Sequence, residues 1–284
     1  MVDNHENWDI EIVPSTGLLD ISWRELWEYR DLIILFVKRD LTATYKQTIL
    51  GPIWFFIQPV FTTLMYLVVF GNIANIPTDG MPKILFYLSG ITVWNYFQES
   101  LIKTSETFIT NQSLFGKVYF PRLAAPISIV ISGLLKFFIQ FVLFLMIWLY
   151  YLIQPGYQIH PNFTVVLLPF YILLMSGLGF GCGILISSLT TRYRDLRFLI
   201  QFAIQLLMYA TPIVYPLSIV PEKYQWLMVM NPVTNITEAL RYSFTGNGHF
   251  SCVHLVYSTF FVVIILLVGI LIFNKVEKNF MDTI

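Results

Sequence analysis

Charged residues are scarce in this chain. Of its 284 residues, 12% are Asp, Glu, Lys or Arg and 56% are hydrophobic, whereas soluble domains usually carry about 25% charged residues. So few charges cannot cover a water-soluble surface, and the apolar residues are gathered into long blocks. The composition therefore predicts an integral membrane protein.

Motifs for nucleotide binding and nucleophilic catalysis are also missing. The nearest approach to a P-loop is Gly116-Lys117, but Asn111 stands where the first glycine of that motif belongs, and Val118 replaces its Ser or Thr. No Ser, His and Asp set converges in the sequence. We therefore expect no catalytic residue in this chain and no ATP bound through such a loop.

Metal and nucleic-acid sites are not indicated either. His249, Cys252 and His254 are close in sequence but lack a fourth ligand, so a loop-to-span junction explains them better than a zinc site. The formal net charge is zero, which provides no basic footprint for nucleic acid. We expect neither a metal nor a nucleic-acid partner.

Six apolar blocks approach the length of about 20 residues that a membrane-spanning helix needs. Helices are expected because lipid offers no partners for free backbone groups. The blocks are Ile53–Phe70, Ile84–Ile102, Ala124–Ile153, Phe163–Leu189, Leu199–Tyr215 and Val253–Phe273. The predicted fold class is an all-α integral membrane protein with six transmembrane helices. Pro212 and Pro216 predict a kink or break in the fifth.

The basic residues are divided unevenly between the two sides of these spans, and Lys and Arg favour cytoplasmic loops. One side holds Arg24, Arg30, Lys38, Arg39, Lys46, Lys103, Lys117, Arg122, Arg192, Arg194, Arg197, Lys275 and Lys278. The other side holds Lys83, Lys223 and Arg241. The pattern predicts that both termini are cytoplasmic, and six spans are consistent with both ends on one side.

An amphipathic helix is predicted before the first span. Ser22 and Glu25 fit a capping box, and Leu26, Trp27 and Ile34 belong to an apolar stripe at helical spacing. Such a helix lies in the membrane interface, either as a simple anchor or as a docking surface for a cytoplasmic partner. We divide the chain into a polar tail (1–21), the amphipathic helix with its linker (22–50) and the six-span transmembrane domain (51–284).

Two short helices are predicted between the fifth and sixth spans. Glu222–Met230 and Thr234–Phe244 mix apolar and polar residues at helical spacing, and Asn231-Pro232 separates them. These helices either re-enter the membrane or lie flat on its outer surface. Their role is either to gate the exit of a pore or simply to cap the outer face. Glu238 and Arg241 are one turn apart and can pair, although a pair exposed to water would contribute little stability.

Charged residues and paired glycines interrupt the apolar blocks. Lys136 lies within the third block, where it either lines a polar path or pairs with another helix. Glu99 and Lys103, in the second, have the spacing of an ordinary helix pair. In the fourth block, glycines four residues apart predict close helix packing rather than a site; the pairs are Gly177/Gly181 and Gly179/Gly183.

Aromatic residues are dense in the first two predicted spans, beside polar residues that cost less when they face an interior. Aromatic faces stack on the apolar faces of sugar rings, so these helices are predicted to line a passage for an amphipathic carbohydrate. Contact with lipid is the simpler alternative for any one of them. The candidate lining residues are Phe61, Tyr66, Phe70, Tyr87, Trp94 and Phe97.

Four segments form an ordered set of motifs: Tyr29–Pro59, Lys117–Pro126 (KVYFPRLAAP), Arg192–Phe202 (RYRDLRFLIQF) and Thr211–Arg241. Together they resemble the permeases of polysaccharide-export ABC transporters, and the resemblance runs from about Arg24 to the C-terminus. No single motif is specific, but the combination is. The members that this chain resembles export O-antigen, capsular polysaccharide or teichoic acid, usually lipid-linked.

The resemblance implies partners and sites. Such permeases form homodimers in the bacterial inner membrane, contact membrane lipids and a lipid-linked polysaccharide, and bind two copies of a separate ATPase subunit that holds ATP and Mg. In these permeases, some elements couple the membrane subunit to the ATPase. The residues of this chain that correspond to them are Trp23, Arg24, Trp27, Lys117, Arg122, Arg192, Arg194 and Asp195. The outer gate corresponds to Asn231, Pro232, Glu238 and Arg241.

Other functions stay open on the sequence. An ABC permease of the same class could carry another cargo, such as a drug or haem, although the RYRDL and NP…EALR patterns favour the polysaccharide branch. A membrane enzyme of glycan assembly would need acidic or His residues that converge at a membrane face, which the sequence does not supply. A secondary transporter would show inverted repeats with matched broken helices, and none is visible.

Overall fold

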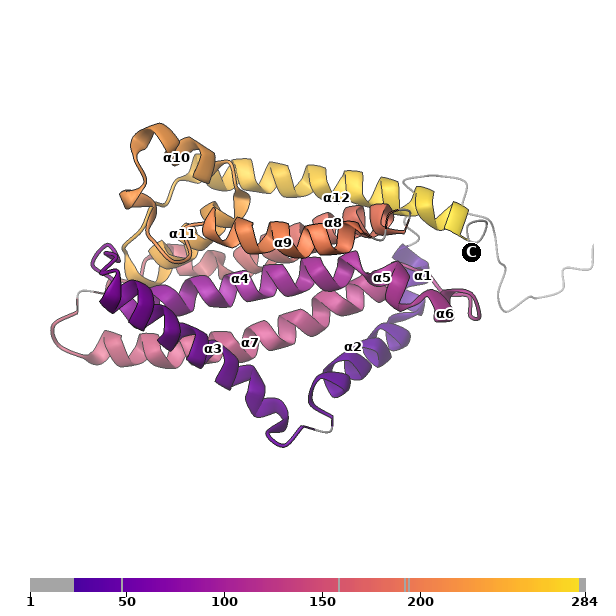
Figure 1. Ribbon diagram of the computed structural model, residues 1–284, viewed down its shortest axis with the longest axis horizontal. Coiled ribbons are helices and arrows are strands. Elements are labelled where there is room, and N and C mark those ends of the chain that lie inside the picture. The colour runs from indigo at the N-terminus through magenta and orange to yellow at the C-terminus, as the bar shows by residue number, and fades with distance from the viewer. Residues whose placement is uncertain (1–22, 47, 158, 192, 194, 281–284) are drawn as a thin grey trace, which may run out of the picture.

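The computed structural model describes residues 23–280 except 47, 158, 192 and 194, and the regular elements of that part are all helices. Long helices run side by side, with α10 and α11 at one end of the bundle and α1, α5 and α6 at the other (Figure 1). The α-helices are α1 (Trp23–Glu28), α2 (Arg30–Tyr45), α3 (Trp54–Tyr66), α4 (Lys83–Ser105), α5 (Thr107–Thr110), α6 (Gln112–Phe115), α7 (Ala124–Ile153), α8 (Leu168–Thr190), α9 (Leu196–Tyr209), α10 (Glu222–Val229), α11 (Pro232–Thr245) and α12 (Cys252–Phe280). Three short 3₁₀ helices are η1 (Gly51–Ile53), η3 (Phe163–Leu167) and η4 (Leu217–Ile219), and η2 (Leu67–Ile73) is a π-helix.

The all-helical prediction is confirmed for the described residues, and the prediction of six apolar spans holds for four of them. In the described part of the chain, four helices are long and apolar enough to cross a membrane: Gly51–Ile73, Ala124–Ile153, Phe163–Thr190 and Cys252–Val276. The second and fifth predicted spans differ from these. Helix α4 is long but carries many polar side chains, and α9 has 14 residues, about 21 Å at the usual rise.

Helix α4 can be polar because other helices cover it. Most of its residues are buried, and α8, α7 and α3 all pack against it. A helix that touches little lipid does not need apolar side chains on every face. Helices α3 and α9 are covered much less. Among their described residues, α3 buries Pro59 and Thr63 and α9 buries Ile204, so the other apolar side chains of both helices are at least partly exposed.

The two glycine pairs of α8 face different neighbours, as close helix packing requires. A Cβ atom on Gly183 would lie 2.5 Å from the Cβ of Thr104 in α4. A Cβ atom on Gly181 would lie 2.9 Å from Cγ2 of Ile265 in α12. The other member of each pair approaches the same helix. Helix α8 is therefore packed tightly between α4 and α12, which confirms the predicted role of these glycines.

Helix α9 ends earlier than its apolar block. The last helical residue is Tyr209, the hydroxyl of Thr211 donates to the carbonyl of Leu207 (2.7 Å), and Pro212 has no N–H with which to continue the helix. The predicted break near Pro212 is therefore present, and an irregular turn follows it. This turn leads through η4 to α10.

The two short outer helices occur where they were predicted, but they differ in burial. Helix α10 is largely exposed, whereas α11 packs against α12 and α4 with nearly every residue buried. Asn231 caps α11 by accepting the N–H of Val233 (3.0 Å), and Pro232 occupies its first turn. Helix α11 is therefore part of the core and does not lie flat on a surface.

The amphipathic segment forms two helices, α1 and α2, and α2 packs against α7. Leu26 and Phe36 are buried, whereas Trp27 and Ile34 are exposed. Leu26 therefore packs inside the protomer while Trp27 and Ile34 face outward, and the predicted amphipathic, interface-lying role of the segment stays a prediction. The predicted cap, Ser22, lies outside the described residues.

We predict that Gly183→Ala destabilises the fold, because the added methyl group collides with Thr104 and forces α4 and α8 apart. Overpacking of this kind costs about 1–3 kcal/mol, so the midpoint of thermal unfolding in detergent should fall. Gly116→Ala is the matched control, since its Cβ would meet nothing nearer than the carbonyl of Gln112 at 3.8 Å. Equal midpoints for the two variants would contradict the packing argument.

Candidate functional site

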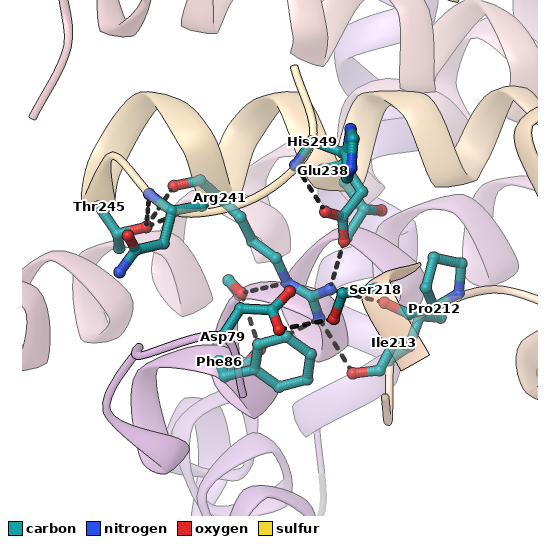
Figure 2. Close-up of polar contacts among 12 residues, drawn as sticks. Asp79, Phe86, Pro212, Ile213, Ser218, Glu238, Arg241, Thr245 and His249 are labelled. Atoms are coloured by element: carbon teal, nitrogen blue, oxygen red, sulfur yellow. Dashed lines mark hydrogen bonds and ion pairs between the residues drawn. The ribbon is translucent and has the colours of Figure 1, made fainter. Parts of the chain in front are cut away.

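The guanidinium group of Arg241 is enclosed at the α10–α11 end of the bundle, with 1% of its side chain exposed. Every nitrogen of this group donates a hydrogen bond, as Figure 2 shows. The acceptors are the carbonyls of Pro212 (2.6 Å), Ile213 (3.0 Å) and Phe86 (3.3 Å), Oε1 of Glu238 (2.9 Å) and Oγ of Ser89 (3.3 Å). We call Arg241 and these five residues the outer junction.

The outer junction ties three segments together. Its two charged residues come from α11, Phe86 and Ser89 from α4, and Pro212 and Ile213 from the turn after α9. Carbonyls beyond a helix end lack N–H partners within that helix, and Arg241 supplies donors to them. The guanidinium carbon also lies 3.7 Å from the centroid of the Phe86 ring, within the range of a cation–π contact.

Glu238 completes the charge balance of the junction. Its second carboxylate oxygen accepts the backbone N–H of His249 (3.1 Å), and its side chain is 4% exposed. A buried ion pair is stable only when its remaining hydrogen bonds are satisfied. Here both carboxylate oxygens and all three guanidinium nitrogens have partners. The junction therefore fixes α11 against α4 and against the loop before α12.

Gly90 makes this arrangement possible. A Cβ atom there would lie 2.8 Å from Nη2 of Arg241 and 3.0 Å from Cγ2 of Ile213. Beside the junction, Ser218 donates to Asp79 (2.6 Å), which joins the segment after α9 to the loop before α4 (Figure 2). The contacts of Arg241 with α4 and with the turn after α9 were not predicted from the sequence. Gly90, a glycine inside the polar helix α4, is the sequence feature that indicates such a close approach.

A second candidate region lies at the opposite end of the bundle. Five phenylalanine rings connect α2, α5, α6, the loop before α7 and α12, with centroids 4.7–5.9 Å apart along the chain of contacts. They are Phe36, Phe108, Phe115, Phe120 and Phe273. Tyr119 also donates to Glu25 of α1 (3.2 Å). We call α1, α2, α5, α6 and these rings the N-terminal platform.

The N-terminal platform presents several of the predicted coupling residues on its surface. Trp27 is 72% exposed, Lys117 is exposed, and Arg24 is exposed and paired with Glu28 (3.3 Å). Arg122 lies over the Phe115 ring at 5.8 Å. Helix α1 begins at Trp23, whose side chain is outside the described part.

The loop after α8 reaches the same end of the bundle. Thr190 donates to the carbonyl of Ser105 (3.0 Å), and Arg197 lies 3.8 Å from Glu106. Asp195 is exposed immediately before α9. Two other predicted coupling residues, Arg192 and Arg194, lie outside the described residues. Both predicted cytoplasmic loops therefore meet the end of α4.

The sequence comparisons decide the family. The profile of the family described as ABC-2 type transporter matches residues 31–245. The chain belongs to this family. Similar proteins include "O-antigen export system permease protein RfbA" of Klebsiella pneumoniae, 26% identical over 253 residues that cover 89% of this chain and 94% of the relative. The RfbA of Myxococcus xanthus is 27% identical over 215 residues (75% and 80%). "Polysialic acid transport protein KpsM" of Escherichia coli is 22% identical over 241 residues (84% and 91%).

Membership places the chain among multi-pass permeases of bacterial membranes, which are not themselves catalytic and which imply a partner ATPase subunit. Within residues 23–280, the described side chains include no group of three or more His, Cys, Asp or Glu that could hold a metal ion. His249, which the sequence placed near two other potential ligands, instead contributes its backbone to the outer junction.

The aromatic residues predicted to line a passage in this ABC-2 permease do not form one surface in a single protomer. Phe61 is 64% exposed, and Tyr66 and Phe70 are half-buried. The three on α4 are enclosed by other helices: Tyr87, Trp94 and Phe97. The lining role of all six stays a prediction, and the residues on α3 and η2 are the ones that reach the protomer surface.

The intramembrane charge Lys136 is buried in α7 and pairs with Glu99 of α4. Glu99 also pairs with Lys103, one turn along its own helix, at 2.6 Å. Of the alternatives left open by the sequence, pairing between helices is the one that the structure shows.

We predict that Arg241→Met lowers stability strongly, because it leaves the Glu238 carboxylate buried without its cation. Breaking a buried pair by removing one partner costs about 3–5 kcal/mol. Arg241→Lys should recover little, since one ammonium cannot reach carbonyls on two sides as the planar guanidinium does. Thermal unfolding in detergent measures both effects, with Lys223→Met on the exposed helix α10 as the control. An unchanged midpoint for Arg241→Met would refute the junction's structural role.

Proposed function

We propose that this chain is the membrane subunit of an ATP-driven exporter that moves a polysaccharide, such as O-antigen, across the bacterial inner membrane. The supporting observation is its similarity, over most of both lengths, to permeases named for O-antigen export in two bacteria and to a polysialic acid transport protein. The four ordered motifs of the sequence favour the same cargo class over a drug or haem.

The proposed topology has six spans with both termini in the cytoplasm. Helix α4 has 23 residues, about 34 Å at the usual rise, which is sufficient to cross the hydrocarbon core of about 30 Å. Its polar side chains are shielded by α3, α7 and α8. Helix α9 is too short alone, so we take the turn after it, which Arg241 of α11 holds, to complete the crossing. The excess of Lys and Arg assigns the N-terminal platform to the cytoplasmic side.

The proposed partner surface is the exposed part of the N-terminal platform, with the loop after α8. Exposed Trp27, Lys117 and Asp195 lie on three segments at the end of the bundle opposite α10 and α11. Two copies of an ATPase subunit, which bind ATP and Mg, would dock here, one on each protomer. Movement of the ATPase would then reach α4 through the contacts of Thr190 and Arg197.

The proposed assembly is a homodimer with the passage for a lipid-linked chain between protomers. Helices α3 and α9 leave large apolar side chains exposed, among them Phe61, Phe198 and Phe202 at 61–66%. Lipid can cover such surfaces, and so can a second copy. Aromatic rings on α3 offer flat faces on which successive sugars can stack without tight binding.

The direct test of function is deletion of the gene in its host, followed by detection of the polysaccharide inside cells and on their surface. Loss of surface polymer together with its accumulation in the cytoplasm, and recovery of both on complementation, supports the proposal. Normal surface polymer in the deletion strain overturns it and favours another cargo.

Trp27→Ala should reduce ATP hydrolysis by the assembled complex several-fold while leaving the amount of folded permease unchanged. The physical reason is that an exposed indole is a typical anchor of a protein interface. Trp226→Ala is the matched control, because Trp226 is 58% exposed on α10 at the opposite end. The docking assignment fails if both variants hydrolyse ATP like the parent complex.

Cysteine labelling tests the passage. In a variant without Cys182 and Cys252, Phe61→Cys should react with a membrane-impermeant thiol reagent in the ATP-bound complex, because water fills a passage. Phe260→Cys on α12 has similar exposure in the protomer (67%) and should remain unreactive if it faces lipid. If neither Phe61→Cys nor Phe260→Cys reacts with the reagent, α3 is an ordinary lipid-facing helix.

A further inference from the structure

A set of polar side chains lies between α4 and α7, apart from the outer junction and the N-terminal platform. The amide of Asn95 donates to Gln140 (3.4 Å). One turn further along both helices, Glu99 accepts from Lys136 and pairs with Lys103 at 2.6 Å. We call Glu99, Lys103 and Lys136 the lysine-pair site.

The lysine-pair site lies within the depth of the bundle. Lys136 is twelve residues after Ala124, the first residue of α7, or about 18 Å along the helix. Its side chain is 6% exposed, whereas those of Glu99 and Lys103 are 28% and 42% exposed. The site is therefore closed at Lys136 and open at Lys103.

The charges at this site do not balance. Both lysine nitrogens contact the same oxygen, Oε1 of Glu99, so two cations share one carboxylate. Asp40 of α2 also faces Lys103, but its carboxylate pairs with Arg39 at 3.0 Å. The ring of Phe55 covers Lys136 at 5.5 Å. Counted as ionised groups, the three side chains carry one more positive than negative charge, and burial makes that imbalance costly at Lys136.

The arrangement also leaves hydrogen-bond donors available. Each ammonium group has three N–H donors, and the contacts with Glu99 use one from each lysine. Two ammonium groups that converge from neighbouring helices can be bridged by an anion with several acceptor oxygens. Phosphate meets this need, and lysine binds phosphate well as a compact charge.

We propose that Lys103 and Lys136 bind the phosphate group of a lipid, with the headgroup entering past Lys103. A lipid is the fitting source because the site lies at membrane depth and opens on the outside of the protomer. Either the phosphodiester of an anionic phospholipid or the phosphate of a polyprenyl carrier has this chemistry. The readout below is lipid binding and not export, so it can fail independently of the proposed function.

The test measures binding of defined lipids to the purified full-length chain in detergent by native mass spectrometry. The probes are phosphatidylglycerol, polyprenyl phosphate and inorganic phosphate, with phosphatidylcholine as the neutral reference. Lys136→Met and Lys103→Met should each weaken binding of the anionic lipids about tenfold, as expected for loss of one charge-assisted hydrogen bond. Glu99→Gln should have the opposite effect, because it removes the competing anion. Lys223→Met should bind like the parent chain.

Comparing the two anionic lipids identifies which lipid supplies the phosphate. Tighter binding of phosphatidylglycerol assigns the site to bilayer lipid, and tighter binding of polyprenyl phosphate assigns it to the carrier. Inorganic phosphate that binds as well as either lipid overturns the proposal. So does parental affinity in both lysine variants. If Lys136→Met does not fold, Lys103→Met and Glu99→Gln decide the matter, because a merely structural ion pair predicts no increase of affinity in Glu99→Gln.

Discussion

Helix α4 carries polar and charged side chains through the middle of a membrane protein, and its charged side chains need partners because lipid supplies none. The rest of the bundle is arranged around this constraint. Helix α8 comes close enough to cover α4 because Gly179 and Gly183 have no side chains. Helix α7 supplies Lys136 for Glu99, and α11 supplies Arg241 for the carbonyl of Phe86 and the hydroxyl of Ser89. Burial of α4 thus determines which helices are central.

Helices α3 and α9, which cover α4 less than α7 and α8 do, have exposed apolar faces. Helix α3 touches α4 along one side and leaves Phe61, Leu64 and Met65 exposed. Helix α9 leaves Phe198 and Phe202 exposed in the same way. An apolar face is stable against either lipid or another apolar surface, so these two helices can exchange neighbours at little cost. The polar core cannot, since separating its partners would leave buried charge unpaired.

The sequence predicted the apolar helices well and the polar contacts poorly. The third block and α7 have the same bounds, Ala124–Ile153, because a long apolar run ends where polar residues begin. The burial of Glu238 and Arg241 was not predictable in this way. Their spacing shows that they can pair, but only the docking of α11 against α4 removes them from water. Glu99 was matched with Lys103 for the same reason, since sequence spacing reveals neighbours on one helix and not Lys136 on another.

The two ends of α4 are tied to different parts of the molecule. At one end Arg241 holds Phe86 and Ser89, and at the other Glu106 faces Arg197 at the start of α9. Helix α9 is therefore linked to α4 at both of its ends, since Arg241 also holds the turn that follows it. A long helix transmits displacement along its axis because each turn is hydrogen-bonded to the next. The half-exposed contact of Arg197 with Glu106 can break at little cost, but at the Arg241 end α4 and α9 must either move together or break the buried hydrogen bonds of Arg241. The second course leaves a desolvated guanidinium without acceptors, so concerted movement of α4 and α9 is the less costly response.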